Sequence, residues 1–400
     1  MLWSAVLSSR AAFVISWLCG STSGQGANQF GVQDRARATQ QMIVIAVQQA
    51  ISSLPPTSAQ SFVYRFNTAD DTYEVDTLLG PTVLRSAQAI GTGKLSLRAA
   101  VSYFELDETL GPISYEVVGT TRCTGFGVRA TSKVGILNLS ANYGLTGRLE
   151  LAFNLPLVLS DTEAFQTFLA RNPGSGRVTE TDCNDLSGLS VDQIPFAGIT
   201  LPGGQPIDFD DGTNAGVGRI SIAAKGVLYA SQSVDVAFFP EFYFPSPNEA
   251  QFAGSSSAAI LPRLVAQAAV SPVRLYADVG YEWDFDNAEL RRFAWDVGVS
   301  LPLHEPRSTF DVGLGGSLFE EGVQWTPETA PILNANGQTV DTIHALEPTR
   351  LGNNFVDFLF GAKIAVTERI VLSGAVSVPV NDDGVRPAAV GTLAVEFALL

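Results

Sequence analysis

Apolar and polar residues alternate with a period of two along much of the chain. In residues 273–285 every odd position is apolar or aromatic (V, L, A, V, Y, W and F), whereas the even positions carry arginine, tyrosine, glycine and acids. Residues 133–143 and 148–158 alternate in the same way. Successive side chains of a β-strand point to opposite faces, so this pattern predicts strands with one apolar face.

The length of these runs indicates strands that cross a membrane. Strands of soluble sheets usually have about 5–6 residues, whereas a tilted strand needs about 9–11 residues to cross a bilayer. The alternating runs lie near residues 94–104, 133–143, 148–158, 217–229, 234–245, 259–270, 273–285, 290–303, 308–320, 355–366, 370–380 and 389–399. Single-chain outer-membrane barrels have an even number of strands, so we predict an all-β fold, a transmembrane antiparallel up-and-down β-barrel of about 12 strands with a short N-terminal helix.

The links between these runs alternate in length. Short links lie at 144–147, 230–233, 271–272, 304–307 and 367–369. The links between those are mostly longer, at 105–132, 159–216, 246–258, 321–354 and 381–388, with a short exception at 286–289. Outer-membrane barrels have short periplasmic turns and long extracellular loops, so this alternation assigns the two rims.

The two faces of the predicted sheet differ in chemistry. One face is apolar and carries aromatic residues, as expected toward lipid. The other face carries the candidate lumen-lining residues Arg98, Glu150, Arg219, Lys225, Asp235, Glu241, Arg263, Arg274, Asp278, Glu282, Asp296, Asp311, Asp357 and Lys363. A water-filled lumen of this kind would pass solutes. Alternatively, these groups pair with one another and with a plug that holds the barrel shut.

The N-terminal region predicts export and a segment that precedes the barrel. Residues 1–27 have the features of a secretory signal peptide, because Arg10 precedes a short apolar stretch and small residues follow; an uncleaved anchor is the alternative. We assign residues 28–92 to a periplasmic N-terminal segment and 93–400 to the barrel. Residues 35–54 predict a helix that plugs the lumen, caps its mouth or assists assembly, or else packs on the periplasmic turns.

Composition excludes several classes of function. The formal charge is −16 and there is no basic cluster, so nucleic-acid binding is not expected. Two His and three Cys leave little material for a metal site, and we expect no metal and no cofactor. No nucleophile-elbow motif is present, and His304 and His344 fall on opposite rims, so we predict that the chain is not an enzyme.

Export places Cys123 and Cys183 in an oxidising compartment. Both lie in long links, 105–132 and 159–216, which belong to the same rim. We therefore predict a disulfide between them; two buried, unpaired thiols are the alternative.

Residues 80–93 (GPTVLRSAQAIGTG), followed by the strand KLSLRAAVSYFELD, resemble a family of bacterial outer-membrane transporters, those similar to the proteins of the meta-pathway of phenol degradation. SANYGLTGRLELAFNLPLV and GVGRISIAAKGVL fit the same family. The chain departs from it at 216–219, where members tend to carry an acid in place of Arg219, and at its Leu399-Leu400 end. The resemblance implies an outer-membrane barrel that passes small, often hydrophobic or aromatic compounds.

These observations predict a porin-like channel or passive transporter for small solutes in the outer membrane of a Gram-negative bacterium. Its expected partners are outer-membrane lipid, small-molecule solutes and the barrel-assembly machinery. The alternative is a structural or adhesive barrel with a plugged lumen that binds partners through its long outer loops.

Overall fold

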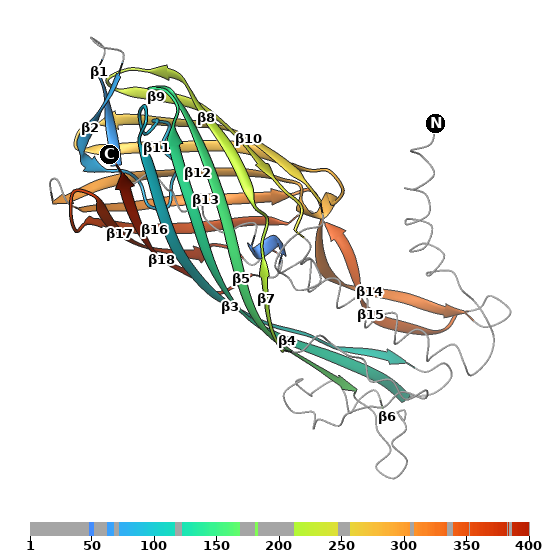
Figure 1. The fold of residues 1–400 in the computed structure, drawn as a ribbon. Helices are drawn as coiled ribbons and strands as arrows, with labels where there is room; N and C mark the ends of the chain where they lie inside the picture. Colours follow the sequence, from blue (N-terminus) through green and yellow to red (C-terminus); the bar gives the residue numbers. More distant parts are fainter. Residues whose placement is uncertain are drawn as a thin grey trace. The chain divides into compact units, whose positions relative to one another are not determined.

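Twelve antiparallel strands form a closed barrel in the computed structural model of the chain (Figure 1). The structure describes residues 48–51, 62–67, 72–116, 122–168, 181–182, 212–246, 257–304, 308–333, 339–351, 353–381, 383 and 386–399. The barrel strands are β3 (Leu95–Glu116), β4 (Arg122–Gly144), β5 (Leu149–Phe168), β8 (Ser221–Ala230), β9 (Val234–Tyr243), β10 (Ala259–Val270), β11 (Val273–Asp284), β12 (Arg292–His304), β13 (Ser308–Phe319), β16 (Asn354–Ala365), β17 (Ile370–Pro379) and β18 (Val390–Leu399). The predicted fold class is therefore confirmed.

The barrel closes between its first and last strands. β18 pairs with β3 from Leu399 opposite Leu95 to Gly391 opposite Tyr103. Each of the other barrel strands also pairs with two neighbours in the ring, so no barrel strand is left as an open edge. In a bilayer this matters because hydrocarbon offers no hydrogen-bond partner to an unpaired backbone group.

Two of the predicted loops are largely strand. Residues 105–132 lengthen β3 and β4, which pair out to Glu116 opposite Cys123. Residues 321–354 form a hairpin of β14 (Gly322–Leu333) and β15 (Thr339–Leu351) beyond the rim of β13 and β16. Alternation is weak in both regions, and cross-strand pairing supplies the order that the pattern lacks.

The predicted strand at 217–229 is interrupted. β7 (Gly212–Val217) pairs with the outer part of β5, and β8 pairs with its inner part. Pro156 of β5 faces the break, where the Gly218 amide donates to its carbonyl at 2.9 Å. Proline has no amide hydrogen to return to the ladder, which accounts for the local interruption.

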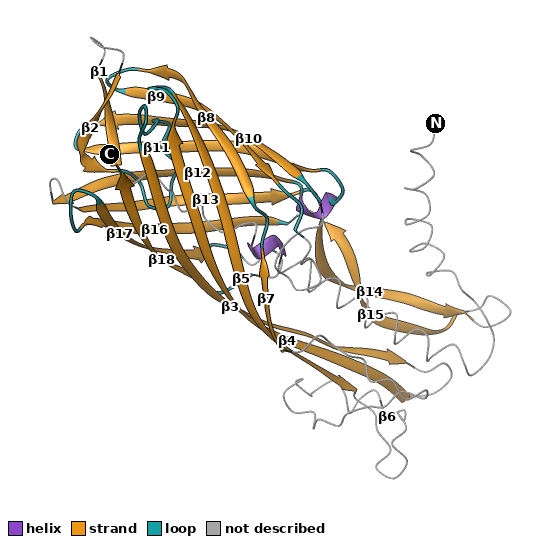
Figure 2. Ribbon diagram, viewed as in Figure 1, coloured by secondary structure: helices purple, strands orange, loops and turns teal. Residues whose placement is uncertain are grey.

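Smaller elements complete the described chain. β1 (Phe62–Asn67) and β2 (Thr72–Leu79) form a separate hairpin, β6 (Thr181–Asp182) pairs with β4, and η3 (Ala288–Leu290) links β11 to β12. Residues 48–51 are helical. Figure 2 shows that the barrel wall consists of strands alone. In the part of the chain that is described, no helix has the length and apolar character needed to cross a membrane.

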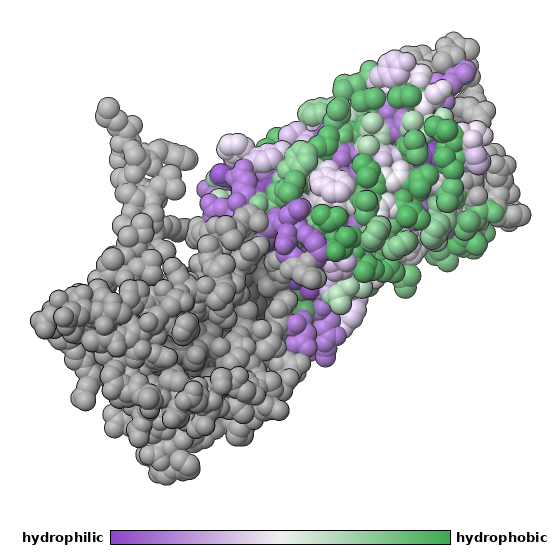
Figure 3. All heavy atoms as spheres, turned by 180° about the vertical axis from the view of Figure 1, so that it is seen from behind, coloured by the Kyte–Doolittle hydropathy of each residue, from purple (hydrophilic) through white to green (hydrophobic). Residues whose placement is uncertain are grey.

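The outer surface of the wall is apolar. Leu393, Leu303 and Leu228 are 72%, 64% and 62% exposed, values that a water-soluble sheet would avoid over so many neighbouring positions. Aromatic residues such as Trp283 and Phe358 lie on the same surface. Apolar residues cover the barrel wall in Figure 3. A lipid environment accounts for this surface, since inward-facing positions on the same strands are mostly polar.

We expect the cost of a charge on this surface to depend on depth. Leu264 lies in the middle of β10 and is 46% exposed, whereas Val270 ends the same strand and is 52% exposed. Leu264→Arg should lower the free energy of unfolding in lipid vesicles by about 2–4 kcal/mol and Val270→Arg by about 0–1 kcal/mol. Denaturant titration measures both values, and equal losses would contradict the membrane assignment of this surface.

Candidate functional site

Residues 79–93, here called the luminal segment, run inside the barrel. Val83 and Leu84 are fully buried and pack with Tyr276, Leu359 and Ala375, which face inward from three different strands. The next part of the segment packs on β8, β9 and β10, where Ala87 contacts Ala237 and Val265, and Ala89 and Ile90 contact Val227. The segment thus follows the inner wall past most of its strands.

Side-chain acceptors from the wall hold this segment. In each of the following pairs an inward-facing acid or amide of the wall accepts a hydrogen bond from the segment. The pairs are Thr82 N with Asp311, Arg85 with Asp278 (3.2 Å), Ser86 with Gln267 (2.9 Å), Gln88 with Asp235 (2.9 Å) and Ile90 N with Glu150 (3.0 Å). The backbone amides of Thr82 and Ile90, which would form ladder hydrogen bonds in a strand, therefore donate to wall carboxylates instead.

Arg85 is the charged centre of the contact. Its guanidinium lies 3.2 Å from Asp278 and 3.7 Å from Asp296, and Arg263 lies 2.6 Å from the other oxygen of Asp278. Asp278 and Arg263 are almost fully buried. Since an unpaired buried carboxylate is costly, the two acids need both arginines in place.

Glycines in the wall make room for the segment. A Cβ added to Gly361 would lie 2.7 Å from Thr82 Cβ and 3.2 Å from Val83 Cγ1, and it would meet no wall atom as closely. A Cβ on Gly298 would lie 2.6 Å from Leu84 Cδ1. Gly361 thus leaves room for Thr82 and Val83, whereas a Cβ on Gly298 would also lie 2.6 Å from the carbonyl oxygen of Val312 in the wall.

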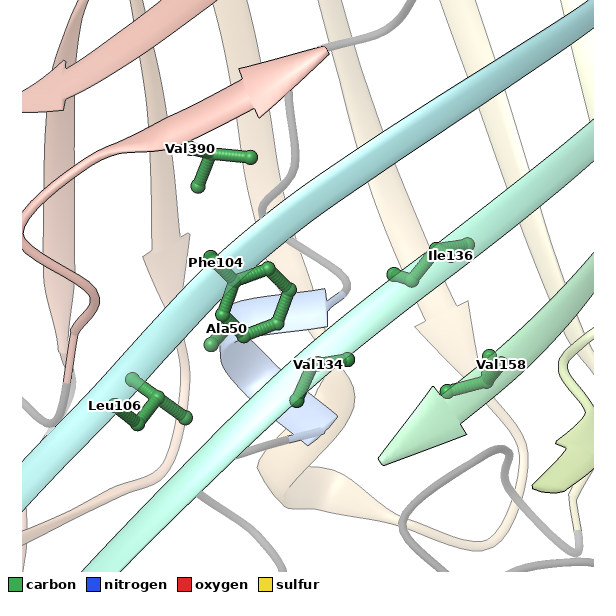
Figure 4. Close-up of a cluster of buried hydrophobic side chains, with 7 residues drawn as sticks. All are labelled: Ala50, Phe104, Leu106, Val134, Ile136, Val158 and Val390. Carbon is green, nitrogen blue, oxygen red and sulfur yellow. The ribbon is translucent and has the colours of Figure 1, made fainter. Parts of the chain in front are cut away.

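A second piece of the N-terminal region occupies the lumen toward the long-loop rim. Ala50 belongs to a buried apolar cluster with Phe104, Val134, Ile136 and Val158, which face inward from β3, β4 and β5, and Figure 4 shows it beside Phe104. These residues lie far along their strands from the short turns. The contact excludes packing on the short turns for this part of the predicted helix.

Hydrogen bonds of Gln49 hold residues 48–51 in place. Its amide nitrogen donates to the carbonyl oxygens of Glu289 (2.8 Å) and Glu321 (2.9 Å), and Asn353 donates to its amide oxygen at 3.0 Å. All three partners lie between strands at the long-loop rim. The rest of the predicted helix at 35–54 lies outside the described residues, as does the predicted signal peptide at 1–27. Of the predicted segment 28–92, residues 79–92 lie within the barrel.

The structure places the predicted lumen residues on the inner side of the wall. Arg219, Glu241 and Arg274 are partly exposed there. The others are buried, namely Arg98, Glu150, Lys225, Asp235, Arg263, Asp278, Glu282, Asp296, Asp311, Asp357 and Lys363. Their burial shows that these groups face other protein atoms more than an open, water-filled channel.

Several of the inward charges form ion pairs with one another. Glu282 receives Arg219 at 2.7 Å and Arg292 at 2.9 Å. Lys225 lies 3.2 Å from Glu150. Because paired charges cancel at close range, the acidic excess of the sequence does not act as a free field along these strands.

Sequence reasoning missed several members of the site. Arg292 and Glu396 occupy inward positions that the period-two pattern would have assigned. Arg386, which pairs with Asp357, and Arg85 lie outside strands, where no periodicity exists to place a side chain. For these two residues only the folded chain identifies the partner.

The comparisons with known proteins give weak resemblances. No protein-family model and no curated protein matches the chain. Among solved structures, the COG4313 outer membrane channel from Pseudomonas putida F1 is 14% identical over 78% of this chain and 98% of its own, with a TM-score of 0.47. The NanC porin is 9% identical over 76% and 100%, with a TM-score of 0.38. A Pseudomonas aeruginosa FadL homologue is 11% identical over 76% and 90%, with a TM-score of 0.35. These matches do not identify the phenol-pathway family, and the function proposed below rests on the barrel's own residues.

The predicted disulfide stays a prediction. The backbone of Cys123 lies opposite Thr181, two positions before Cys183 in the chain, but Cys183 lies outside the described residues. We expect the folded, non-reduced protein to yield neither thiol to an alkylating reagent and both after reduction. Mass spectrometry of the alkylated protein measures this, and two reactive thiols without reduction would refute the pairing.

Loss of the Arg85 side chain should release the luminal segment from the wall. Removing one partner of a buried ion pair costs about 3–5 kcal/mol, and we expect the low end for Arg85→Ala because Arg263 still pairs with Asp278. Hydrogen exchange should therefore accelerate in peptides that cover 80–93 and stay unchanged in the barrel strands. Arg291→Ala is the matched control, since Arg291 stacks on Trp283, an exposed residue of the outer surface. Equal exchange in both variants would argue against the role of Arg85.

Proposed function

We propose that this protein is an outer-membrane channel for small solutes whose passage is closed by its own luminal segment. The proposal rests on one observation, which is that side-chain contacts hold residues 79–93 inside the closed barrel. Twelve strands of wall would surround any solute, and the segment that occupies the lumen is a separate stretch of chain.

The two parts of the structure differ in how firmly they are held. The wall has continuous backbone ladders, such as the pairing of β3 with β4 along nearly their whole length. The segment is held by side-chain hydrogen bonds, an ion pair and buried apolar contacts, and its residues 80–92 form no strand pairing with the wall. Local opening takes place where few contacts must break, so the segment can leave its seat while the barrel stays closed. Solutes would then move by passive diffusion through a polar lumen.

A structural or adhesive barrel with a permanently closed lumen is the second candidate. Two observations favour this candidate. Gly361 leaves room for Thr82 and Val83, and Leu84 packs in a buried apolar cluster as residues of a permanent core do. The β14–β15 hairpin forms a sheet of its own between β13 and β16 in the chain and offers a surface for partners. The two candidates differ in one property, which is whether unseating the segment produces conductance.

The wider assignment is part of the same proposal. We infer a Gram-negative outer membrane as the location, reached through an N-terminal signal peptide and the barrel-assembly machinery. The apolar outer surface supports contact with outer-membrane lipid. The resemblance to transporters of the phenol-degradation group suggests small hydrophobic or aromatic compounds as solutes. We propose no catalytic residue, metal or cofactor.

Gly361→Ala tests the proposal with a minimal change. The added methyl group would press on Thr82 and Val83, while Gly391→Ala, the matched control, meets nothing within 4 Å. Overpacking costs about 1–3 kcal/mol, which would raise the unseated population by about 5-fold to 150-fold. We expect more frequent channel openings in planar bilayers for Gly361→Ala than for the wild type and for Gly391→Ala.

The channel proposal would be contradicted if the segment of Gly361→Ala leaves the wall and the planar bilayer still shows no conductance. Hydrogen exchange of residues 80–93 shows whether the segment has moved, and unchanged mobility in cold detergent shows that the barrel is intact. Faster exchange without conductance would favour the structural barrel.

A further inference from the structure

Two acids of the wall lie side by side where the luminal segment contacts it. Asp278 of β11 and Asp296 of β12 are directly opposite each other in the sheet, and both are buried on its inner side. Their carboxyl groups are close enough for a hydrogen bond. Such a bond requires a proton on one of the two groups, so two carboxyls at this distance can share a single proton. These two residues are here called the acid pair.

Two arginines balance the charge of the acid pair. Arg85 of the luminal segment lies 3.2 Å from Asp278 and 3.7 Å from Asp296. Arg263 of β10 lies 2.6 Å from the second oxygen of Asp278. Asp278 thus has two close arginines, whereas the ion pair of Asp296 with Arg85 is the longer one. This geometry favours Asp296 as the member that takes up a proton.

Other titratable and charged groups lie on the inner side of the neighbouring strands. They are Glu241 and Tyr243 on β9, Arg274 on β11, Glu282 on β11 with its partners Arg219 and Arg292, Asp311 on β13, Lys363 on β16, and Asp357 on β16 with its partner Arg386. None of these groups belongs to the luminal segment. Their charges are therefore in place whether the segment is seated or not.

The luminal segment carries one charged side chain, that of Arg85, in residues 79–93. Its other polar contacts use neutral donors, such as the Thr82 amide with Asp311 and the Ile90 amide with Glu150. A carboxyl group that has taken up a proton can still accept a hydrogen bond, but it no longer forms an ion pair. Proton uptake by the wall therefore acts on the segment chiefly through Arg85.

We propose that the acid pair is a proton-operated latch for the luminal segment, which keeps the channel closed near neutral pH and lets it open in acid. The inference rests on the proposed channel function and adds its regulation. With both acids ionised, two negative charges balance Arg85 and Arg263. With one proton on the pair, the two arginines share one negative charge, and the departure of Arg85 restores the balance. Protons therefore favour the unseated segment.

Arg85 is the arginine that moves. Arg263 is almost fully buried and belongs to β10, which is held by backbone ladders with β9 and β11. Arg85 belongs to a stretch of chain that has no strand pairing with the wall. Since local opening takes place where few contacts must break, the repulsion between the two arginines is relieved by movement of the segment.

Hydrogen exchange tests the latch in the full-length protein in lipid vesicles. The measured quantity is the protection factor of peptides that cover 80–93, which corrects for the direct effect of pH on amide exchange. We expect it to fall about tenfold between about pH 7.5 and about pH 5, since one linked proton changes an equilibrium by up to about tenfold per pH unit. An unchanged protection factor in the wild type would overturn the latch.

Asp296→Asn removes the proton site while keeping the size of the side chain. Its segment should be as weakly protected at neutral pH as that of the wild type in acid, with little further change on acidification. Asp286→Asn is the matched control and should keep the full response, because Asp286 is exposed in the short link between the same two strands. Arg85→Gln removes the charge from the segment and serves as a second variant in case Asp296→Asn does not fold. A wild-type response to pH in Asp296→Asn or in Arg85→Gln would refute the latch.

Planar-bilayer recordings over the same pH range separate this inference from the channel itself. Acid-dependent unseating without conductance at any pH would leave the latch in place and refute the channel. Conductance that does not vary with pH would leave the channel in place and refute the latch.

Discussion

Hydrogen bonding of the backbone in a medium without water is the constraint on which this structure depends. A sheet in hydrocarbon must satisfy every amide and carbonyl within itself, so its first and last strands have to meet. Here β18 and β3 meet in register over nine residue pairs, from Gly391 opposite Tyr103 to Leu399 opposite Leu95. Once the sheet is closed, period-two alternation separates an apolar surface toward lipid from a polar lumen.

The polar lumen then creates a second requirement. Carboxylates such as Asp278, Asp311 and Glu150 are buried inside a protein wall and need donors at short range. Neighbouring strands supply some of them, and the luminal segment supplies the rest through backbone amides and Arg85. The segment in turn has no ladder with the wall among the described strands, so the wall acids provide the partners that its amides would otherwise lack. Glycines such as Gly361 let the two surfaces approach closely enough for this exchange.

The wall and the luminal segment are held by different kinds of interaction, and this difference links the architecture to the proposed function. The wall is held by ladders along every strand, whereas the contents of the lumen are held by individual side-chain contacts. Interactions of the second kind open locally without global unfolding. A channel that opens and closes needs this arrangement, because the barrel wall has to stay folded while the luminal segment moves.

The sequence by itself determined the barrel. Its alternation placed a strand at 259–270, which is also where β10 lies, and it assigned the inward face on which Asp278 and Glu282 are found. This succeeds because side-chain direction in a strand is a local property with a fixed period. Only the tertiary structure decided that Thr82 rests against Gly361, that Arg85 pairs with Asp278, and that Ala50 lies inside the barrel. The luminal segment has no periodicity, and its partners come from strands far away in the chain. Their proximity arises when the sheet closes around the segment, and no local pattern encodes it.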